Sequence, residues 1–304
     1  MYADQVATSG EKPGSFPYAA QLRRELSARN QRYAATHCLP SRESYGDPPV
    51  VCYLPREDGK AHGNFLPQTY ARILARESWS IRLHKVHAQA RAALPREDRG
   101  WRELDSSNSS DALLMNVFCF PGTLKSPRVF ALLGVLAPGI PEFGVKAKVP
   151  LASGHADRTE VDMRLGDLLV EAKLTETDFQ SARPELVEAY RDFSQVFRQH
   201  ELPRDGKRYL SYQLLRNVLA AYANHCSFCV MVDARRPDLV EAWYAVLRSV
   251  RPTSLRPALK IITWQELSQA LPGRLQRFLE EKYGISSDQS RASLSNPFAG
   301  CAIS

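Results

Sequence analysis

The clearest pattern in the chain lies between Glu160 and Lys173, where apolar and polar positions alternate on both sides of Gly166-Asp167. Alternation with a period of two is typical of β-strands, and glycine at the start of a two-residue loop favours a type II′ hairpin turn. This register places Asp162 opposite Glu171 and Glu160 opposite Lys173. One face then carries only apolar residues and is expected to be core: Val161, Met163, Leu165, Leu168, Val170 and Ala172. The other face carries Glu160, Asp162, Arg164, Leu169, Glu171 and Lys173.

The rest of the chain alternates between helical and strand patterns. Helices are predicted over 17–35, 68–94, 112–120, 184–199, 211–225, 238–250 and 265–284, the last interrupted at Pro272-Gly273. Strands are predicted over 142–149, 227–233 and 258–264, and the segment 128–139 is apolar enough for a buried helix or strand. Thr263 to Glu266 has the sequence of a helix capping box. The order from about residue 108 predicts a mixed α/β fold with a central sheet flanked by helices.

Composition and charge indicate the kind of partner and the cellular compartment. The 304 residues carry a formal net charge of +7 and a sequence pI of about 9.1, which fits a polyanionic partner such as DNA. We expect a cytoplasmic protein without a membrane span or signal peptide. Six scattered cysteines are expected to be reduced. Cys226 and Cys229 have the spacing of metal ligands, but packing in a strand is favoured; likewise, an exposed or capping role is favoured for His84 and His87.

The polar face of the predicted hairpin concentrates carboxylates and one ammonium group. Asp162 and Glu171 at hairpin spacing provide the hard oxygen ligands that Mg²⁺ prefers, and Mn²⁺ is expected to substitute. Lys173, on the same face as Glu171, can position or activate the attacking water. The alternative is a solvated hairpin whose acidic and basic residues form surface salt bridges.

Asp162 followed by Glu171-Ala172-Lys173 on the next strand resembles the PD-(D/E)xK nuclease superfamily, although Val161 stands where the motif name has proline. Within it, the chain looks most like uncharacterised, restriction-endonuclease-like bacterial proteins, through the segments SSDALLMN, VEAKLTE and YQLLRN. The resemblance implies a restriction-endonuclease-like α-β-β-β-α-β core. It implies metal binding by Asp162, Glu171 and the carbonyl of Ala172, with Glu160 as an auxiliary or second-metal acid. It also implies substrate support by Gln213.

In that superfamily, an earlier helix often donates one more acid to the metal site. Glu103 and Asp111 are the candidates here. For Asp111, a role at the start of a helix is as well supported. Nucleic-acid contacts are expected from Arg204, Lys207, Arg208, Arg216 and Asn217. The cationic face of the 68–94 helix, formed by Arg72, Arg76, Arg82, Lys85 and Arg91, is interpreted as solvated.

Four segments are expected: a disordered N-terminus (1–14), a mainly helical extension packed on the core (15–105), a nuclease-like domain (106–285) and a disordered tail (286–304). The leading hypothesis is a Mg²⁺-dependent deoxyribonuclease, an endonuclease of restriction, defence or repair type. Cleavage of both DNA strands would suit a homodimer. The alternatives are a catalytically inactive DNA-binding or assembly module with the nuclease fold, and a protein unrelated to nucleic acids.

Overall fold

The computed structural model describes residues 17–44, 48–86, 102–136 and 139–287. Predictions for residues 1–14 and 288–304, for His87 and Arg91, and for the last part of the 68–94 helix lie outside these ranges. No helix in the described residues is both long and apolar enough to cross a membrane.

A five-stranded mixed sheet forms the centre of the molecule, in the order β12-β11-β7-β6-β3. β3, β6 and β7 are antiparallel neighbours, whereas β7, β11 and β12 run parallel. The strands are β3 (Glu142–Lys146), β6 (Glu160–Leu165), β7 (Leu168–Ala172), β11 (Ser227–Val232) and β12 (Leu259–Thr263). The predicted mixed α/β fold with a restriction-endonuclease-like core is confirmed.

The hairpin of β6 and β7 has the predicted register where the two strands pair. Leu165 pairs with Leu168 and Met163 with Val170, and the turn residue Gly166 has φ +61°. Positive φ at the first turn position alone suits the predicted type II′ turn, because glycine adopts it without steric cost. Five of the six predicted core residues pack in one hydrophobic cluster, but Val161 packs with Leu169 on the opposite side. Val161 lies farther from the turn than Met163, in the part of β6 that pairs with β3 but no longer with β7.

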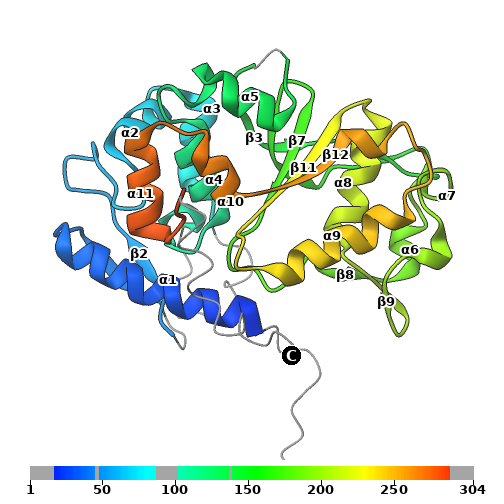
Figure 1. The fold of residues 1–304 in the computed structure, drawn as a ribbon, viewed down its shortest axis with the longest axis horizontal. Helices are drawn as coiled ribbons and strands as arrows, with labels where there is room; N and C mark the ends of the chain where they lie inside the picture. The colour runs from blue at the N-terminus through cyan, green and yellow to red at the C-terminus, as the bar shows by residue number, and fades with distance from the viewer. Residues whose placement is uncertain (1–16, 45–47, 87–101, 137–138, 288–304) are drawn as a thin grey trace, which may run out of the picture.

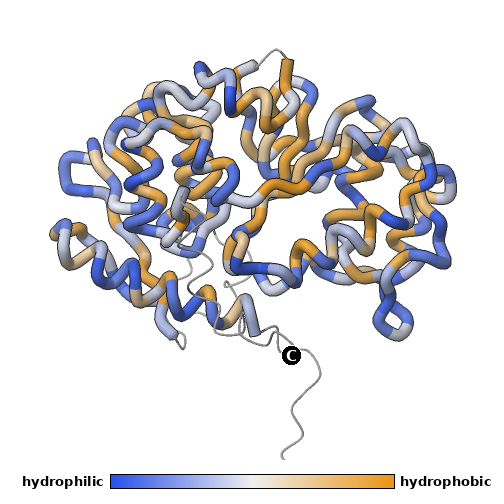
Figure 2. Tube along the Cα trace, in the orientation of Figure 1, coloured by the Kyte–Doolittle hydropathy of each residue, from blue (hydrophilic) through white to orange (hydrophobic). Residues whose placement is uncertain are grey.

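Helices cover both faces of the sheet, as Figure 1 shows. On one side lie α6 (Pro184–Val187), α7 (Phe193–Val196), α8 (Tyr212–Ala223) and α9 (Pro237–Ser249). On the other side lie α4 (Ser110–Phe118), α5 (Pro127–Leu133), α10 (Trp264–Gln269), α11 (Gly273–Tyr283) and α1 (Pro17–Thr36). Apolar residues follow the central strands in Figure 2, as expected for strands buried on both faces.

The residues before the core contribute α1, α2 (Pro67–Leu74), α3 (Glu77–Ser80) and the two-stranded sheet of β1 (Ser41–Glu43) and β2 (Val51–Tyr53). Short 3₁₀ turns follow at η1 (Ile81–His84) and η3 (Glu103–Asp105). α1 packs on α11: Leu22 and Leu26 share the cluster of α11 residues. At this interface Lys282 is buried, and its Nζ lies 3.7 Å from the ring centre of Tyr53 and donates to Asn30 Oδ1 at 2.8 Å.

Some of the predicted helix boundaries are confirmed and others are wrong. The capping box at Thr263 and the helix break at Pro272-Gly273 are confirmed. The single 68–94 helix is wrong: Arg76 is extended between α2 and α3, and the indole of Trp79 donates to the carbonyl of Pro141. The single 184–199 helix is also wrong, because Tyr190 forms a β-bridge with Leu151 between α6 and α7. Tertiary contacts override helical periodicity in both segments.

Two small sheets and three short turns complete the described elements. The segment before α8 is a hairpin of β9 (Arg204–Asp205) and β10 (Arg208–Leu210), joined by β8 (Ser181–Ala182). β4 (Val149–Pro150) pairs with β5 (Ala156–Asp157). The other 3₁₀ turns are η4 (Thr123–Lys125), η5 (Gln199–Glu201) and η6 (Arg256–Ala258).

Candidate active site

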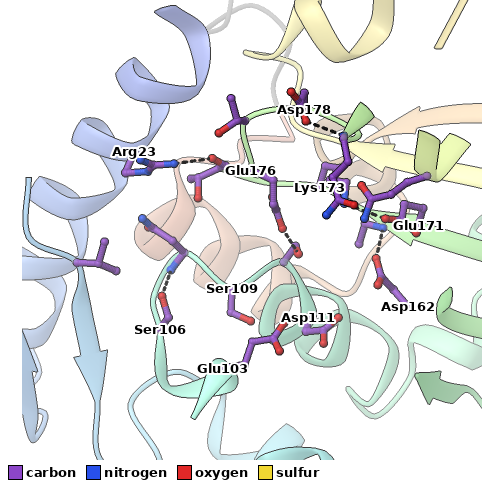
Figure 3. Close-up of a pocket in the computed structure, with 18 of the residues that line it drawn as sticks. Arg23, Glu103, Ser106, Ser109, Asp111, Asp162, Glu171, Lys173, Glu176 and Asp178 are labelled. Atoms are coloured by element: carbon purple, nitrogen blue, oxygen red, sulfur yellow. Dashed lines mark hydrogen bonds and ion pairs between the residues drawn. The ribbon is translucent and has the colours of Figure 1, made fainter. Parts of the chain in front are cut away.

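A polar pocket of about 640 Å³ lies where β6 and β7 meet the start of α4. Its walls come from distant segments: α1, the 103–111 segment, the 171–180 segment and the start of α8. Figure 3 shows Asp162, Glu171 and Lys173 on one side of this pocket and Arg23 on another. The pocket therefore brings together three of the predicted catalytic residues, and Gln213 lines it as well.

Asp162 occupies the point at which β6 and β7 separate. The ladder ends at Met163 and Val170, and beyond it one oxygen of Asp162 accepts the backbone N–H of Ala172 at 2.8 Å. The carboxylate thus replaces the missing ladder partner, so the divergence of the strands costs no unsatisfied donor at this position. The expected pairing of Glu160 with Lys173 does not form, because the β6–β7 ladder has already ended at Met163 and Val170. Glu160 keeps only its pairing with Lys146 of β3, on the other side of β6. A carboxylate fixed in this way faces the opening between the strands.

Glu171 is held by two side chains. Its Oε1 accepts from Lys173 Nζ at 2.8 Å, and its Oε2 accepts from Asn217 Nδ2 at 2.8 Å. Arg216 donates to Asn217 Oδ1 at 3.2 Å and to the carbonyl of Glu160 at 3.0 Å. Because a guanidinium group only donates, it fixes the amide of Asn217 with its NH₂ toward Glu171. Arg216 and Asn217 are 4% and 0% exposed, so they support Glu171 from within the fold.

The alternative of a solvated hairpin is wrong, since Glu171 and Lys173 are only 1% and 5% exposed. Burial alone would lower the pKa of Lys173, but the negative charges of Glu171, Glu176 and Asp162 outweigh it and raise that pKa. Burial, together with the charges of Glu171 and Asp111, raises the pKa of Asp162 well above its ordinary value. The site therefore contains more negative charge than its own ammonium group neutralises.

Asp111 lies in the first turn of α4 and lines the same pocket. The N-cap is Ser109, whose hydroxyl accepts the N–H of Ala112 at 3.1 Å. Asp111 instead pairs with Arg82 at 2.6 Å and with Lys85 at 3.2 Å, and Lys85 also pairs with Glu103 at 2.9 Å. The interpretation of Arg82 as solvated is thus wrong: it is buried, and sequence separation hid its partner.

Glu160 is turned away from the pocket. Its carboxylate pairs with Arg82 Nη1 at 3.1 Å, its side chain is 42% exposed, and it is not among the residues that line the pocket. Arg82 passes over Gly144, which has φ +66° and where a Cβ atom would lie 2.1 Å from Arg82 Nη1. Only glycine fits this approach. The ion pair and the glycine together hold Glu160 beside Arg82.

The basic residues predicted to contact nucleic acid are distributed over two places. Arg204 stacks on Tyr209 and pairs with Glu188, and Arg208 donates to the carbonyl of Ser181 at 2.6 Å. These two residues and Lys207 are exposed on the β9–β10 hairpin, whereas Arg216 and Asn217 are buried. The structure thus separates an exposed basic hairpin from the pair that supports Glu171.

Cys226 and Cys229 are buried in different hydrophobic clusters, in agreement with a packing role. Among the described residues, no group of three or more His, Cys, Asp or Glu side chains could hold a metal ion by itself.

The oxygen groups of Asp162, Glu171 and Ala172 nevertheless suit a hard divalent cation, which commonly takes one or two carboxylates and keeps several waters. Burial and, after it, the charges of Glu171 and Asp111 raise the pKa of Asp162, and a bound cation would offset those charges. Gln213 supports the same conclusion, since its Oε1 is buried and has no hydrogen-bond partner within the described residues. A hydrated cation would supply donors there.

Comparison with known proteins decides the family. A family model described as "Restriction Endonuclease associating with ARP" (REase-ARP) matches residues 25–284. The chain belongs to the REase-ARP family. No curated protein and no solved structure matches the chain. The match covers α1 from Glu25 onward as well as the sheet, so most of the helical extension lies within the matched residues. Membership of a restriction-endonuclease-like family indicates a nuclease, and such families typically use divalent metal ions.

Proposed function

We propose that the protein is a Mg²⁺-dependent deoxyribonuclease that hydrolyses phosphodiester bonds in the pocket between β6, β7 and α4. The observation that carries this proposal is the group formed by half-buried Asp162 and the buried pair Glu171 and Lys173 at the divergence of the two strands. A fully buried ion pair beside a second carboxylate is costly for a fold, and it serves a purpose if a cation and a phosphate bind there.

The chain's own residues have separate tasks in this proposal. Asp162, Glu171 and the carbonyl of Ala172 would hold the cation, which would polarise the phosphate and lower the pKa of a bound water. Lys173 orients the attacking water and stabilises negative charge that develops on the phosphate. Asn217 and Arg216 keep Glu171 in one orientation, and Gln213 offers its unpaired Oε1 to water or substrate. Glu160 would act as an auxiliary acid only after release from Arg82.

The substrate and partners form the second part of the proposal. We infer that DNA is the substrate, with the β9–β10 hairpin contacting the backbone through Arg204, Lys207 and Arg208. The family description names an association with ARP, and the proposal includes it. Cleavage of both strands in one binding event would suit two copies of the chain, because each proposed site cuts one bond at a time.

The test is cleavage of supercoiled plasmid and of linear single- and double-stranded DNA with Mg²⁺, with Mn²⁺ or with a chelator. We expect metal-dependent cleavage by the wild type and its loss in Asp162→Asn. Asparagine keeps an acceptor for the N–H of Ala172 but removes the charge, so the fold should be retained. Binding of DNA that weakens with salt, without cleavage of any substrate, would instead support the inactive DNA-binding module.

A further inference from the structure

Arg23 differs from the other cations that line the pocket. Lys173 is paired with Glu171, and Lys85 is paired with Glu103 and Asp111. Arg23 donates from Nη2 to the backbone carbonyl of Thr175 at 3.2 Å, and no carboxylate partner for it is found among the described residues. A carbonyl orients the guanidinium group but does not neutralise it. Arg23 is therefore the pocket cation whose charge is available to a ligand.

The position of Arg23 is fixed by the packing of α1. Its neighbour Leu22 is 2% exposed within the hydrophobic cluster that includes α11, and Glu25 forms an ion pair with Arg235 at 2.5 Å. Further along, Arg29 donates to the carbonyl of Glu280 at 3.2 Å. These contacts anchor α1 to α11 and to the end of β11 on either side of Arg23. The guanidinium group is thus held at the pocket by a helix from outside the nuclease core (Figure 3).

Two hydroxyl groups line the same pocket and have a free hydrogen. Ser106 Oγ accepts from the N–H of Asn108 at 3.2 Å, and Ser109 Oγ accepts from the N–H of Ala112 at 3.1 Å. Each bond uses a lone pair and leaves the O–H able to donate. Neither hydroxyl has an acceptor among the described residues. An arginine with spare N–H groups and hydroxyl donors is a set of groups that binds phosphate oxygens.

The charge around the pocket shows why such a group is needed. Six acidic residues line it, but only three cations: Arg23, Lys85 and Lys173. A metal ion at Asp162 and Glu171 would offset part of that excess where the bond is cut. A neighbouring phosphate of the same strand would still meet uncompensated carboxylates, and it can enter only beside a cation without an acidic partner.

We propose that Arg23, assisted by Ser106 and Ser109, binds a phosphate of the substrate strand next to the phosphate that is cut. The inference rests on the proposed nuclease function and adds a second phosphate subsite to it, which favours a strand with at least one flanking phosphate over an isolated phosphodiester. It also assigns a role to the helical extension, because α1 supplies the arginine that contacts this phosphate.

The experiment compares wild type and Arg23→Ala on a fluorescent single-stranded oligonucleotide and on bis(4-nitrophenyl) phosphate, which has no flanking phosphate. A hydrogen-bonded contact to a charged group contributes about 1.5–3 kcal/mol, which corresponds to roughly 10–100-fold. We expect KM for the oligonucleotide to rise by that factor, with kcat little changed and hydrolysis of the small diester unaffected. An unchanged KM, or an equal loss on both substrates, would overturn the inference.

Two matched variants and one binding measurement control this result. Arg24→Ala removes an exposed cation that is not among the lining residues, and Arg23→Lys keeps the charge; the first should behave as wild type and the second should recover part of the loss. Oligonucleotide affinity, measured in chelator at several salt concentrations, should show a salt slope smaller by about 0.7 in Arg23→Ala, the value for one phosphate on a single strand.

The binding measurement separates the two proposals. If the wild type hydrolyses neither substrate, the proposed function fails, whereas the salt slope still decides whether Arg23 contacts a phosphate. An unchanged slope would contradict the contact even in an active nuclease.

Discussion

Two buried lysines, in two regions of the molecule, have opposite surroundings. Lys173 lies in the pocket with Glu171 at 2.8 Å and with Asp162 and Glu176 near enough to raise its pKa above the ordinary value. Lys282, between α1 and α11, contacts the ring of Tyr53 and an amide oxygen of Asn30, and burial lowers its pKa well below that value. No carboxylate near Lys282 offsets this loss of hydration in the described residues.

The difference shows how burial acts on an ammonium group. Removing a cation from water always disfavours its charged form, and only nearby negative charge reverses the effect. Excess carboxylate charge in the pocket keeps Lys173 charged, which is the form required to stabilise a phosphate. At the α1–α11 interface, the aromatic rings give only part of that compensation, although a cation over a ring gains some electrostatic attraction. The carboxylates of the pocket thus keep a buried lysine charged, whereas the α1–α11 interface uses a buried lysine only in packing.

The largest expected effect comes from removing the charge of Lys173. Lys173→Met should lower kcat for DNA cleavage by roughly 10²–10³-fold, the usual loss for one group that stabilises the transition state. Single-turnover cleavage rates measure it. Because the substitution leaves Glu171 buried without its cation, Lys173→Met/Glu171→Gln serves as the folded control, with both partners neutral. Activity of Lys173→Met near the wild-type level would contradict the role of Lys173.

A smaller effect is expected from Asn217, which acts on the partner of Lys173. Asn217→Ala removes the donor to Glu171 Oε2, and groups that orient metal ligands contribute about 10–100-fold to metal affinity or activity. Isothermal titration with Mn²⁺ should show this weakening, and cleavage should be partly recovered at high Mg²⁺ concentration. If Asn217 only supports the fold, thermal stability would fall while metal affinity in the folded protein stays constant.

The smallest expected effect is on the pH dependence of stability, through Lys282. Its folded-state pKa lies below the unfolded value, so the unfolded state binds more protons between these two values. Stability should therefore rise with pH in that window, by at most about 1.4 kcal/mol per pH unit, and fall toward lower pH. Lys282→Met should remove this contribution. Urea unfolding at several pH values measures it, and identical pH profiles of the two proteins would show that Lys282 stays charged.

The sequence was sufficient for the parts of the structure that depend on neighbours in the chain. Alternation around Gly166 predicts the register of β6 and β7, and Thr263 with Glu266 predicts a helix start. The same register predicts that Asp162 and Glu171 lie close together. It could not show that the strands separate there, because the separation depends on the side chain of Asp162 replacing a backbone partner.

The remaining site residues depend on contacts between distant segments. Asn217 reaches Glu171 from 46 residues away, and Arg82 reaches Asp111 from 29 residues away. For Asn217 a signal existed: it lies one turn after Gln213 on the same side of α8, which already pointed toward the site. For Arg82 and Arg23 no local pattern distinguishes a solvated charge from a buried or pocket-lining one, because their partners depend on how the elements pack.

The packing of α1 on α11 also affects the biosynthesis of the protein, since these are the first and last helices described. Synthesis at about 5–20 residues per second would delay α11 behind α1 by roughly 10–50 seconds. During that interval Leu22 and Leu26 lack α11, the helix on which α1 packs, and Arg23 is not yet held at the pocket. The hairpin with Asp162 and Glu171 is synthesised earlier than α11. The wall of the pocket that contains Arg23 is therefore completed only after α11 has left the ribosome.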